Sequence, residues 1–342
     1  MKIGSRALES IFDFEKTNDR RGALRMKLVS FKLMKNSGDY KIGCFVNDRV
    51  IDIQQAHKKY LMDKEKVTLL NGEDKLLPSD PSQFFSLGIP AIQQAKKACD
   101  HVLNSKVEDV GFIFDHEAIT LSTPIPNPSK IICVGQNYAE HVSEMASDIP
   151  KFPVLFAKFS NALIGPEDAI EKPAITNRLD YEVELAIVIG KEAANISKEE
   201  AYDYIAGYTI ANDTSARDLQ KQTPQWLQGK TLDRSTPVGP WVVTSDEVGD
   251  AANLSIRSYV NGEERQASHT SHFIFDIPFL LEYISKIMTL EPGDIILTGT
   301  PDGVGFAMSP PRFLEEGDQV TLEIEKIGRM ENVVKNRSSS GK

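Results

Sequence analysis

Three acidic side chains in two short apolar segments have a spacing that could hold a metal ion. Glu182 and Glu184 lie near the start of a run rich in Val, Ile and Leu that ends at Gly190. Such a run predicts a β-strand, in which residues two apart point to the same face. Two like charges about 6 to 7 Å apart beside apolar residues repel each other unless a cation neutralises them. A divalent cation would remove that cost.

The third acidic residue, Asp213, follows a second strand-like run at residues 208–212. Three carboxylates, with no CxxC, HxH or HExxH spacing in the chain, suit a hard six-coordinate ion such as Mg²⁺ or Mn²⁺ rather than zinc. The carboxylates would fill half of an octahedron, and substrate and water could fill the rest. The alternative is an edge strand that leaves both glutamates in water and binds no metal.

A candidate acid–base pair precedes these carboxylates in the chain. A strand-like run leads into Gly135-Gln-Asn-Tyr-Ala-Glu-His-Val-Ser-Glu144, which predicts a short helix capped by Asn137. On that helix His141 and Glu144 are close enough to interact, and the carboxylate would raise the basicity of the imidazole, as a general base for water requires. The alternative is a surface histidine with an incidental acidic neighbour. Glu140 also neighbours Glu144 and is the less suitable partner.

Lys158 and Lys230 each lie in a largely apolar segment, where a solvent-exposed lysine would be the ordinary interpretation. The segment around Lys230 resembles a P-loop, but Pro224 stands where GxxxxGK[ST] needs glycine, so no nucleotide site is expected. A further strand-like run enters a glycine-rich loop at 298–305 that does not match GxGxxG. Its backbone N–H groups and Thr300 could hold a carboxylate.

Alternating and helical periodicities indicate the elements that position these residues. Strands separated by turn residues, as in a small antiparallel unit, are expected at 27–33, 41–46 and 49–53, and helices at 56–70 and 89–103. Later strands are expected within 251–265 and 319–327, and an apolar helix at 273–287. Three prolines within 122–129 force extended backbone and suit a domain boundary.

We therefore expect a β-rich α+β protein with two unequal domains. The divisions are an N-terminal extension (1–25), a small N-terminal α/β domain (26–118), a catalytic domain (119–335) and a tail (336–342). Residues 7–15 could form a short amphipathic helix. The extension holds no candidate acid–base pair or ligand set, and we expect it to be dispensable for chemistry.

Composition narrows the classes of function. A net charge of −10 over 342 residues disfavours a nucleic-acid partner. The longest apolar stretches are interrupted or too short to span a bilayer, and no signal-peptide core begins the chain, so we expect a cytoplasmic protein without a membrane partner. Cys44, Cys99 and Cys133 lack metal-ligand spacing and are expected to be reduced, buried thiols.

Five motifs occur in the order found in the fumarylacetoacetate hydrolase superfamily, which this chain resembles over roughly residues 120–335. They are Gly135-Gln-Asn-Tyr-Ala-Glu-His-Val-Ser-Glu144, Asp180-Tyr-Glu-Val-Glu184, Asn212-Asp-Thr-Ser-Ala-Arg-Asp-Leu-Gln220, Gly229-Lys230 and Thr298-Gly-Thr-Pro-Asp-Gly-Val-Gly305. Residues 26–118 resemble, more loosely, the small N-terminal domain of many members. The resemblance implies a mixed β-sandwich roll with the metal and active site at one mouth, and usually a homodimer.

The resemblance also implies roles for individual residues. The metal ligands would be Glu182, Glu184 and Asp213, which agrees with the charge argument, and the water-activating dyad would be His141 and Glu144. Lys230 and Gln220 match groups that stabilise negative charge on the substrate, and the supporting substrate-binding positions would be Lys158, Arg217 and Thr300. Arg217 has an alternative role: four residues after Asp213, it could only orient that ligand.

The implied substrate is a 2-oxo acid, whose carboxylate and carbonyl oxygens can chelate the metal. Cleavage between C3 and C4 would leave an enolate that the metal and Lys230 stabilise. This main expectation covers hydrolysis of an acylpyruvate or fumarylacetoacetate and decarboxylation of oxaloacetate. The alternative is keto–enol isomerisation of oxaloacetate or of a 2-hydroxy-dienedioate through the same enolate. A non-catalytic, metal-containing dicarboxylate-binding protein is the alternative of another class, against which Lys230 and the dyad argue.

Overall fold

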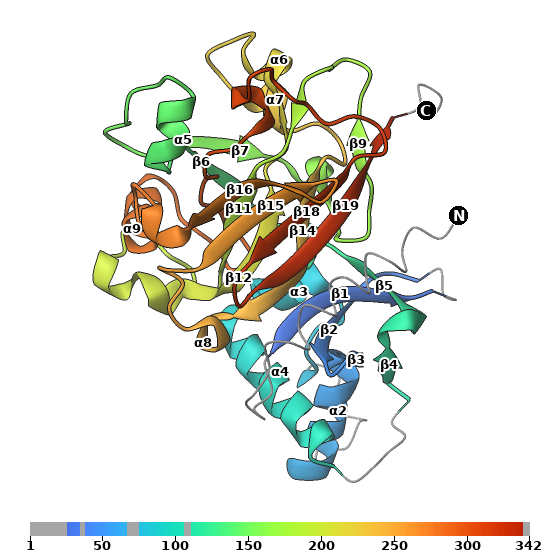
Figure 1. The fold of residues 1–342 in the computed structure, drawn as a ribbon. Coiled ribbons are helices and arrows are strands. Elements are labelled where there is room, and N and C mark those ends of the chain that lie inside the picture. The colour runs from blue at the N-terminus through green and yellow to red at the C-terminus, as the bar shows by residue number, and fades with distance from the viewer. Residues whose placement is uncertain (1–25, 35–37, 67–74, 106–110, 338–342) are drawn as a thin grey trace.

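A twelve-stranded sheet forms the centre of the molecule (Figure 1). The computed structural model describes residues 26–34, 38–66, 75–105 and 111–337. The strand order is β4-β3-β2-β1-β14-β12-β11-β17-β6-β7, with β5 beside β1 and β8 beside β14. The strands are β1 (Lys27–Leu33), β2 (Lys41–Val46), β3 (Arg49–Asp52), β4 (Ile113–Asp115), β5 (Ile119–Ser122), β6 (Ile131–Gly135), β7 (Val154–Lys158), β8 (Leu163–Ile164), β11 (Val183–Ile189), β12 (Ile205–Asn212), β14 (Thr236–Thr244) and β17 (Ile295–Leu297).

A second sheet and a short ribbon complete the β structure. The five-stranded sheet has the order β16-β15-β18-β19-β9, and β10 pairs with β13 as a separate ribbon. Their bounds are β9 (Ile170–Lys172), β10 (Leu179–Asp180), β13 (Ser215–Ala216), β15 (Ser255–Val260), β16 (Glu263–His269), β18 (Gln319–Ile324) and β19 (Gly328–Asn336). The strands expected in the C-terminal half therefore belong mainly to this second sheet.

The helices begin where a side chain can satisfy their first backbone N–H groups. Asp52 accepts from Gln55 N at the start of α2, and Asp276 accepts from Phe279 N at the start of α9. Asp276 explains why the helix expected from residue 273 begins only at 277. The helices are α2 (Ile53–Lys64), α3 (Pro81–Ser86), α4 (Gly88–Leu103), α5 (Ala139–Glu144), α6 (Arg217–Gln220), α7 (Leu227–Lys230), α8 (Ser245–Val248) and α9 (Ile277–Ile287).

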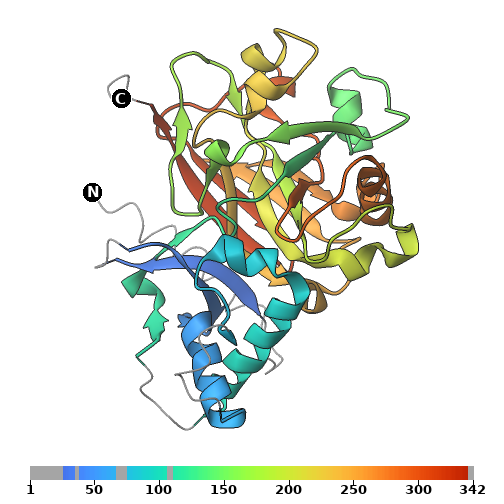
Figure 2. The same cartoon turned by 180° about the vertical axis from the view of Figure 1, so that it is seen from behind.

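The N-terminal strands are continuous with the central sheet. β1 pairs antiparallel with β14, with Lys27 opposite Val243, and β5 returns to pair with β1. Hydrogen bonds of one sheet thus cross the boundary expected near residue 118. Figures 1 and 2 show α2 and α4 at one end of the molecule and α5, α6 and α7 at the other. The helix expected at residues 7–15 lies outside the described part.

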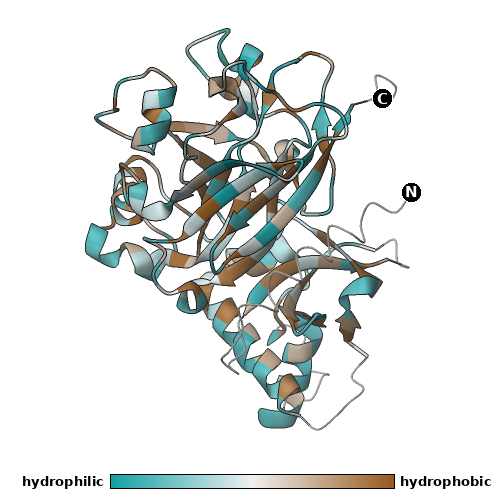
Figure 3. Ribbon diagram, in the orientation of Figure 1, coloured by the Kyte–Doolittle hydropathy of each residue, from teal (hydrophilic) through white to brown (hydrophobic). Residues whose placement is uncertain are grey.

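The two faces of β11 belong to two hydrophobic cores. Leu185 and Ile187 pack in the core that also contains Leu322 of the five-stranded sheet, whereas Ala186 and Val188 face the core that includes the N-terminal helices. Hydrophobic residues recur along the strands of both sheets (Figure 3). Glu184 is two residues before Ala186, so the alternation of side chains along a strand places it on the same face as Ala186. This face points away from the core that contains Leu322.

Two further expectations concern thiols and membranes. Cys44, Cys99 and Cys133 are buried and unpaired by disulfide bonds, as expected. Among the described residues, no helix has both the length and the hydrophobicity that a membrane span requires.

Candidate metal-dependent active site

Four neighbouring strands of the central sheet bring the candidate residues together at one end of the strands. The start of β11 lies beside the end of β12, because Val183 pairs with Asn212. On its other side β11 pairs antiparallel with β17, and β17 runs parallel to β6. The C-terminal ends of β17 and β6 therefore lie beside the start of β11. β11 is therefore an interior strand. The alternative of an edge strand with both glutamates in water is wrong.

The three acidic residues lie close together at this end of the strands, and all three are buried. One carboxylate oxygen from each of Glu182, Glu184 and Asp213 lies within 4.8 Å of those of the other two. Backbone contacts hold them in place: Asp213 N donates to Glu182 O (2.9 Å), and Glu182 N donates to Asn212 Oδ1 (3.0 Å). Three hard oxygen donors facing one point fit a divalent cation of the Mg²⁺ or Mn²⁺ type.

Two buried lysines contact these carboxylates directly. Lys230 Nζ lies 2.7 Å from Glu182 Oε2 and 2.7 Å from Asp213 Oδ2. Lys158 Nζ lies 2.8 Å from Asp213 Oδ1 and also donates to Thr214 O. Their exposed fractions are only 2% and 1%, so the interpretation of both as solvent-exposed lysines is wrong. No local pattern signals this pairing, because the partners are distant in sequence.

Arg217 joins the triad to a fourth buried carboxylate. Its Nε lies 2.8 Å from Asp180 Oδ2 and its NH2 lies 2.6 Å from Glu182 Oε1. Its NH1 donates to Gln220 Oε1 at 3.2 Å, which places Gln220 beside the same group. Arg217 thus orients Glu182 and not Asp213, and the idea that it orients the ligand four residues earlier is wrong. Asp180 is a site residue that the sequence reasoning missed, although it continues the alternation of acidic residues at 182 and 184.

With every group ionised, the carboxylates of this cluster outnumber its lysine and arginine side chains by one. Asp180 and the triad supply four buried carboxylates, against Arg217, Lys158 and Lys230. Burial alone would raise the pKa of Glu182, but Lys230 and Arg217 outweigh it and hold this pKa at about 2. Burial, and then the negative charges of Asp213 and Glu182, raise the pKa of Glu184 well above its usual range. A divalent cation would stabilise the ionised form of Glu184.

The glycine-rich loop after β17 donates backbone N–H groups to the carboxylates of the protein itself. Gly299 N donates to Glu184 Oε2 (2.7 Å) and Gly303 N to Glu144 Oε2 (2.9 Å). The amides of Gly305 and Phe306 donate to the two carboxylate oxygens of Asp180. The loop was expected to hold a carboxylate, and the carboxylates it holds belong to the chain. Thr300 Oγ1 accepts from Gln266 Nε2 (2.8 Å) and keeps its own hydrogen for donation.

The candidate dyad is formed in the structure. His141 Nδ1 lies 2.7 Å from Glu144 Oε1, and His141 is 6% exposed, so a surface histidine is excluded. His141 lies on α5, which follows β6, so it is at the same end of these strands as the triad. Glu140, the less suitable neighbour, is exposed. Because the carboxylate engages Nδ1, the Nε2 atom is left to exchange a proton.

Asn137 does not cap α5, and that expectation is wrong. Its side chain donates to Phe275 O (3.1 Å) and Thr298 O (2.7 Å) and accepts from Phe275 N (2.8 Å). Asn137 therefore ties α9 and the β17 loop to the start of α5, while Tyr138 takes the cap position without a side-chain bond. This tertiary role explains a buried asparagine that local capping rules misassigned.

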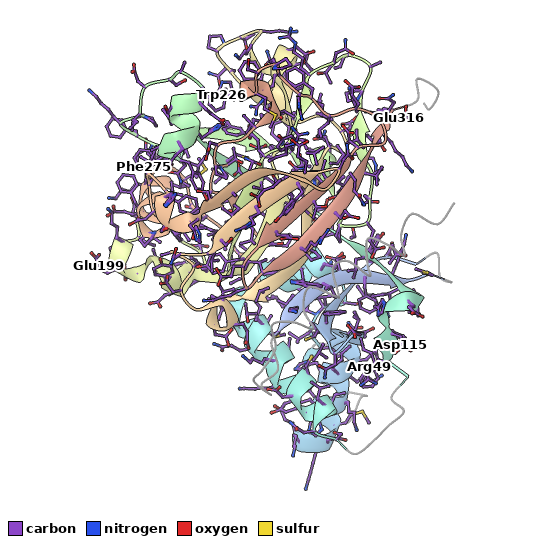
Figure 4. All side chains as sticks on the ribbon, in the orientation of Figure 1. Arg49, Asp115, Glu199, Trp226, Phe275 and Glu316 are labelled. Atoms are coloured by element: carbon purple, nitrogen blue, oxygen red, sulfur yellow. The ribbon has the colours of Figure 1, made fainter. Side chains whose placement is uncertain are left out.

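Aromatic residues limit access of water to Lys230. The ring centroid of Phe156 lies 5.0 Å from Lys230 Nζ and 5.3 Å from the ring centroid of Trp226. Figure 4 labels Trp226 beside α7, at the end of the molecule that carries α5. An apolar wall strengthens the electrostatic interactions of the buried ammonium group.

Comparison with known proteins agrees with this geometry. Residues 130–335 match the family described as "Fumarylacetoacetate (FAA) hydrolase C-terminal". The chain is 43% identical to "Oxaloacetate tautomerase fahd2, mitochondrial" of Xenopus laevis over 319 residues, 91% of each chain. It is 40% identical to "Oxaloacetate tautomerase YisK" of Bacillus subtilis over 298 residues, 86% of this chain and 95% of the relative.

A solved structure extends the comparison to a metal-bound relative. Maleylpyruvate hydrolase from Sphingobium sp. SYK-6, in complex with manganese(II) and pyruvate, has a TM-score of 0.69 and 28% identity and covers 92% of this chain and 100% of its own. The architecture is therefore shared with a relative that was solved with manganese(II) bound. On the matched family region and on these identities, the chain belongs to the fumarylacetoacetate hydrolase family.

Proposed function

We propose that the protein is a divalent-metal-dependent keto–enol tautomerase of oxaloacetate or a closely related 2-oxo dicarboxylate. The observation that carries the proposal is the buried triad with Lys230 bonded to two of its members at 2.7 Å, because this combination suits an enolate. The names of the relatives at 43% and 40% identity favour tautomerisation over the carbon–carbon cleavage that was the main expectation.

Each part of the site has a role in this reaction. A divalent cation, Mg²⁺ or Mn²⁺, held by Glu182, Glu184 and Asp213 would supply Lewis-acid polarisation of the 2-carbonyl. His141, oriented by Glu144, would take a proton from C3, and the C–H electron pair would form the C2–C3 double bond as charge moves to the 2-oxygen. Lys230 would stabilise that charge, and protonation of the oxygen would give the enol. Gln220, Lys158, Arg217 and Thr300 would position the substrate and the ligands.

Carbon–carbon cleavage is the second candidate, and the solved maleylpyruvate hydrolase supports it. The test compares three reactions of the Mg²⁺-loaded protein. Ultraviolet absorbance follows keto–enol interconversion of oxaloacetate, a coupled assay follows pyruvate release, and an acylpyruvate tests hydrolysis. We expect faster interconversion without pyruvate formation. Pyruvate release or acylpyruvate cleavage at a higher kcat/KM would favour lyase or hydrolase activity, and binding of oxaloacetate without turnover would indicate a binding protein.

Two expectations from the sequence accompany the proposal. The family resemblance leads us to propose a homodimer. The cytoplasmic location remains a prediction, since the name of the Xenopus relative describes that protein as mitochondrial.

A further inference from the structure

Three cationic side chains, those of Arg178, Arg217 and Lys221, lie near one another beside the candidate active site. Their positions in the ribbon and on the helical turn are ones at which neighbouring like charges are unfavourable. Arg217 N donates to Arg178 O (2.9 Å), which continues the β10–β13 pairing and places these residues opposite each other. Lys221 follows four residues after Arg217 and donates its backbone N–H to Arg217 O (3.2 Å). Like charges are destabilising both across a ribbon and four residues apart on a helical turn. Two unfavourable placements thus coincide at Arg217.

Only the innermost of the three charges is neutralised. Arg217 is paired with Asp180 and Glu182, whereas Arg178 and Lys221 are exposed and form no ion pair within the described residues. The nearby Asp218 instead accepts from Thr176 Oγ1 (2.6 Å) and Asn177 N (3.2 Å). Partial burial, and then the charges of Arg217 and Arg178, lower the pKa of Lys221. Local positive potential therefore persists in a chain whose net charge is −10.

Aromatic rings hold the two exposed cations without neutralising them. Lys221 Nζ lies 3.7 Å from the ring centroid of Phe306, and Arg178 Cζ lies 6.0 Å from that of Phe313. The Phe306 ring is also 6.0 Å from Arg217 Cζ, and its backbone N–H binds Asp180. Cation–π contacts of this kind fix a charge in place while leaving it available to an anion. Phe306 thereby connects the exposed cations to the buried network around Glu182.

We propose that Arg178 and Lys221 form a cationic rim that captures dianionic 2-oxo acids and selects them over monoanions. The inference rests on the proposed function, since it specifies the substrate class of the same site. A protein with strong net negative charge repels dianions, and a local group of cations beside the candidate active site opposes that repulsion next to the site. Arg178 and Lys221 do not touch the reacting atoms in this role. They act on capture, so kcat/KM should depend on them and kcat should not.

The double variant Arg178→Gln/Lys221→Gln tests the rim. At low ionic strength we expect kcat/KM for oxaloacetate tautomerisation to fall by about tenfold with little change in kcat. At high salt the loss should shrink to within about twofold, because exposed charges are screened. The charge-conserving variant Arg178→Lys/Lys221→Arg should retain the wild-type kcat/KM and its salt dependence.

A matched control removes the same charges elsewhere. Arg49→Gln/Lys97→Gln takes one arginine and one lysine from β3 and α4, in the N-terminal part of the molecule where Figure 4 labels Arg49. It should behave as wild type. The proposal is overturned if this control loses as much kcat/KM as the rim variant, or if the loss in the rim variant is independent of salt.

A binding measurement separates failure of the rim from failure of the proposed function. Calorimetric titration of the Mg²⁺-loaded protein with oxalate, a dianion, and pyruvate, a monoanion, measures selectivity without turnover. The rim variant should lose about tenfold in oxalate affinity at low salt and much less in pyruvate affinity. Equal losses would overturn the rim. Wild-type protein that prefers oxalate through the rim but does not tautomerise oxaloacetate would contradict the proposed function alone.

Discussion

The backbone N–H of Gly299 donates a 2.7 Å hydrogen bond to Glu184 Oε2, which makes the glycine-rich loop part of the candidate metal site. Gly299 has a φ of +103°, and a Cβ there would lie 2.7 Å from Asn137 Cβ. Only glycine meets both requirements without strain. The same loop supports Glu144 through Gly303, so one segment orients a candidate metal ligand and the carboxylate that holds the candidate base His141.

Gly299→Ala should therefore weaken metal binding. We expect a loss of about 1 to 3 kcal/mol in stability from backbone strain and about a tenfold loss in Mn²⁺ affinity by calorimetry. Gly317→Ala is the matched control, because Gly317 also has positive φ (+91°) but its Cβ would meet open space. Equal Mn²⁺ affinities in the two variants would show that the loop does not orient Glu184.

The triad should make activity dependent on a divalent ion. Excess chelator should abolish activity, and added Mg²⁺ or Mn²⁺ should restore it. Glu184→Gln or Asp213→Asn should abolish both activity and Mn²⁺ binding, because each removes a charged ligand from a set of three. Glu140→Gln, a change to an exposed carboxylate on α5, is the control and should remain active. Full activity in chelator would refute the metal assignment.

Substitution of His141 or Glu144 should reduce the rate most in the reaction in which this dyad transfers a proton. His141→Ala should slow tautomerisation by roughly 10² to 10⁴-fold, as expected for a positioned base. Glu144→Gln should cause a smaller loss, since it leaves the imidazole in place with a weaker partner. If acylpyruvate hydrolysis occurs, His141→Ala should reduce it more than any oxaloacetate decarboxylation, which needs no nucleophile. Equal losses in those two reactions would assign His141 a role common to both.

Glu167 should make stability depend on pH. Burial is the main cause that raises its pKa from 4.5 to about 7, although Leu121 N donates to it. The folded state therefore binds a proton more tightly than the unfolded state, so this contribution to stability is present below pH 4.5 and is lost as pH rises through about 7. Glu167→Gln should flatten the fall in Tm across this window. An unchanged pH profile in thermal melts would contradict it.

The homodimer expected from the family can be tested by mass. Light scattering at micromolar concentration should give about twice the 38.0 kDa of one chain. A value near the mass of one chain would refute the expectation.

The local periodicity of the sequence determined much of the candidate site. Alternation along a strand was enough to place Glu182 and Glu184 together, and helical spacing was enough to bring His141 to Glu144. The order of five short motifs indicated the family that the comparisons then showed. These inferences depend on neighbours in sequence or on a likeness, so they needed no knowledge of long-range contacts.

Only the tertiary structure decided which groups surround those residues. Lys158 and Lys230 are 55 and 17 residues from Asp213, and their pairing depends on how β7 and α7 approach the ends of β11 and β12. The bond from Gly299 to Glu184 spans 115 residues and follows from the pairing of β11 with β17. Asn137 met the local rule for a helix cap, yet contacts with Thr298 and Phe275 replaced that role. Burial sets these choices, because a polar group removed from water takes whichever partner the packed sheets bring within reach.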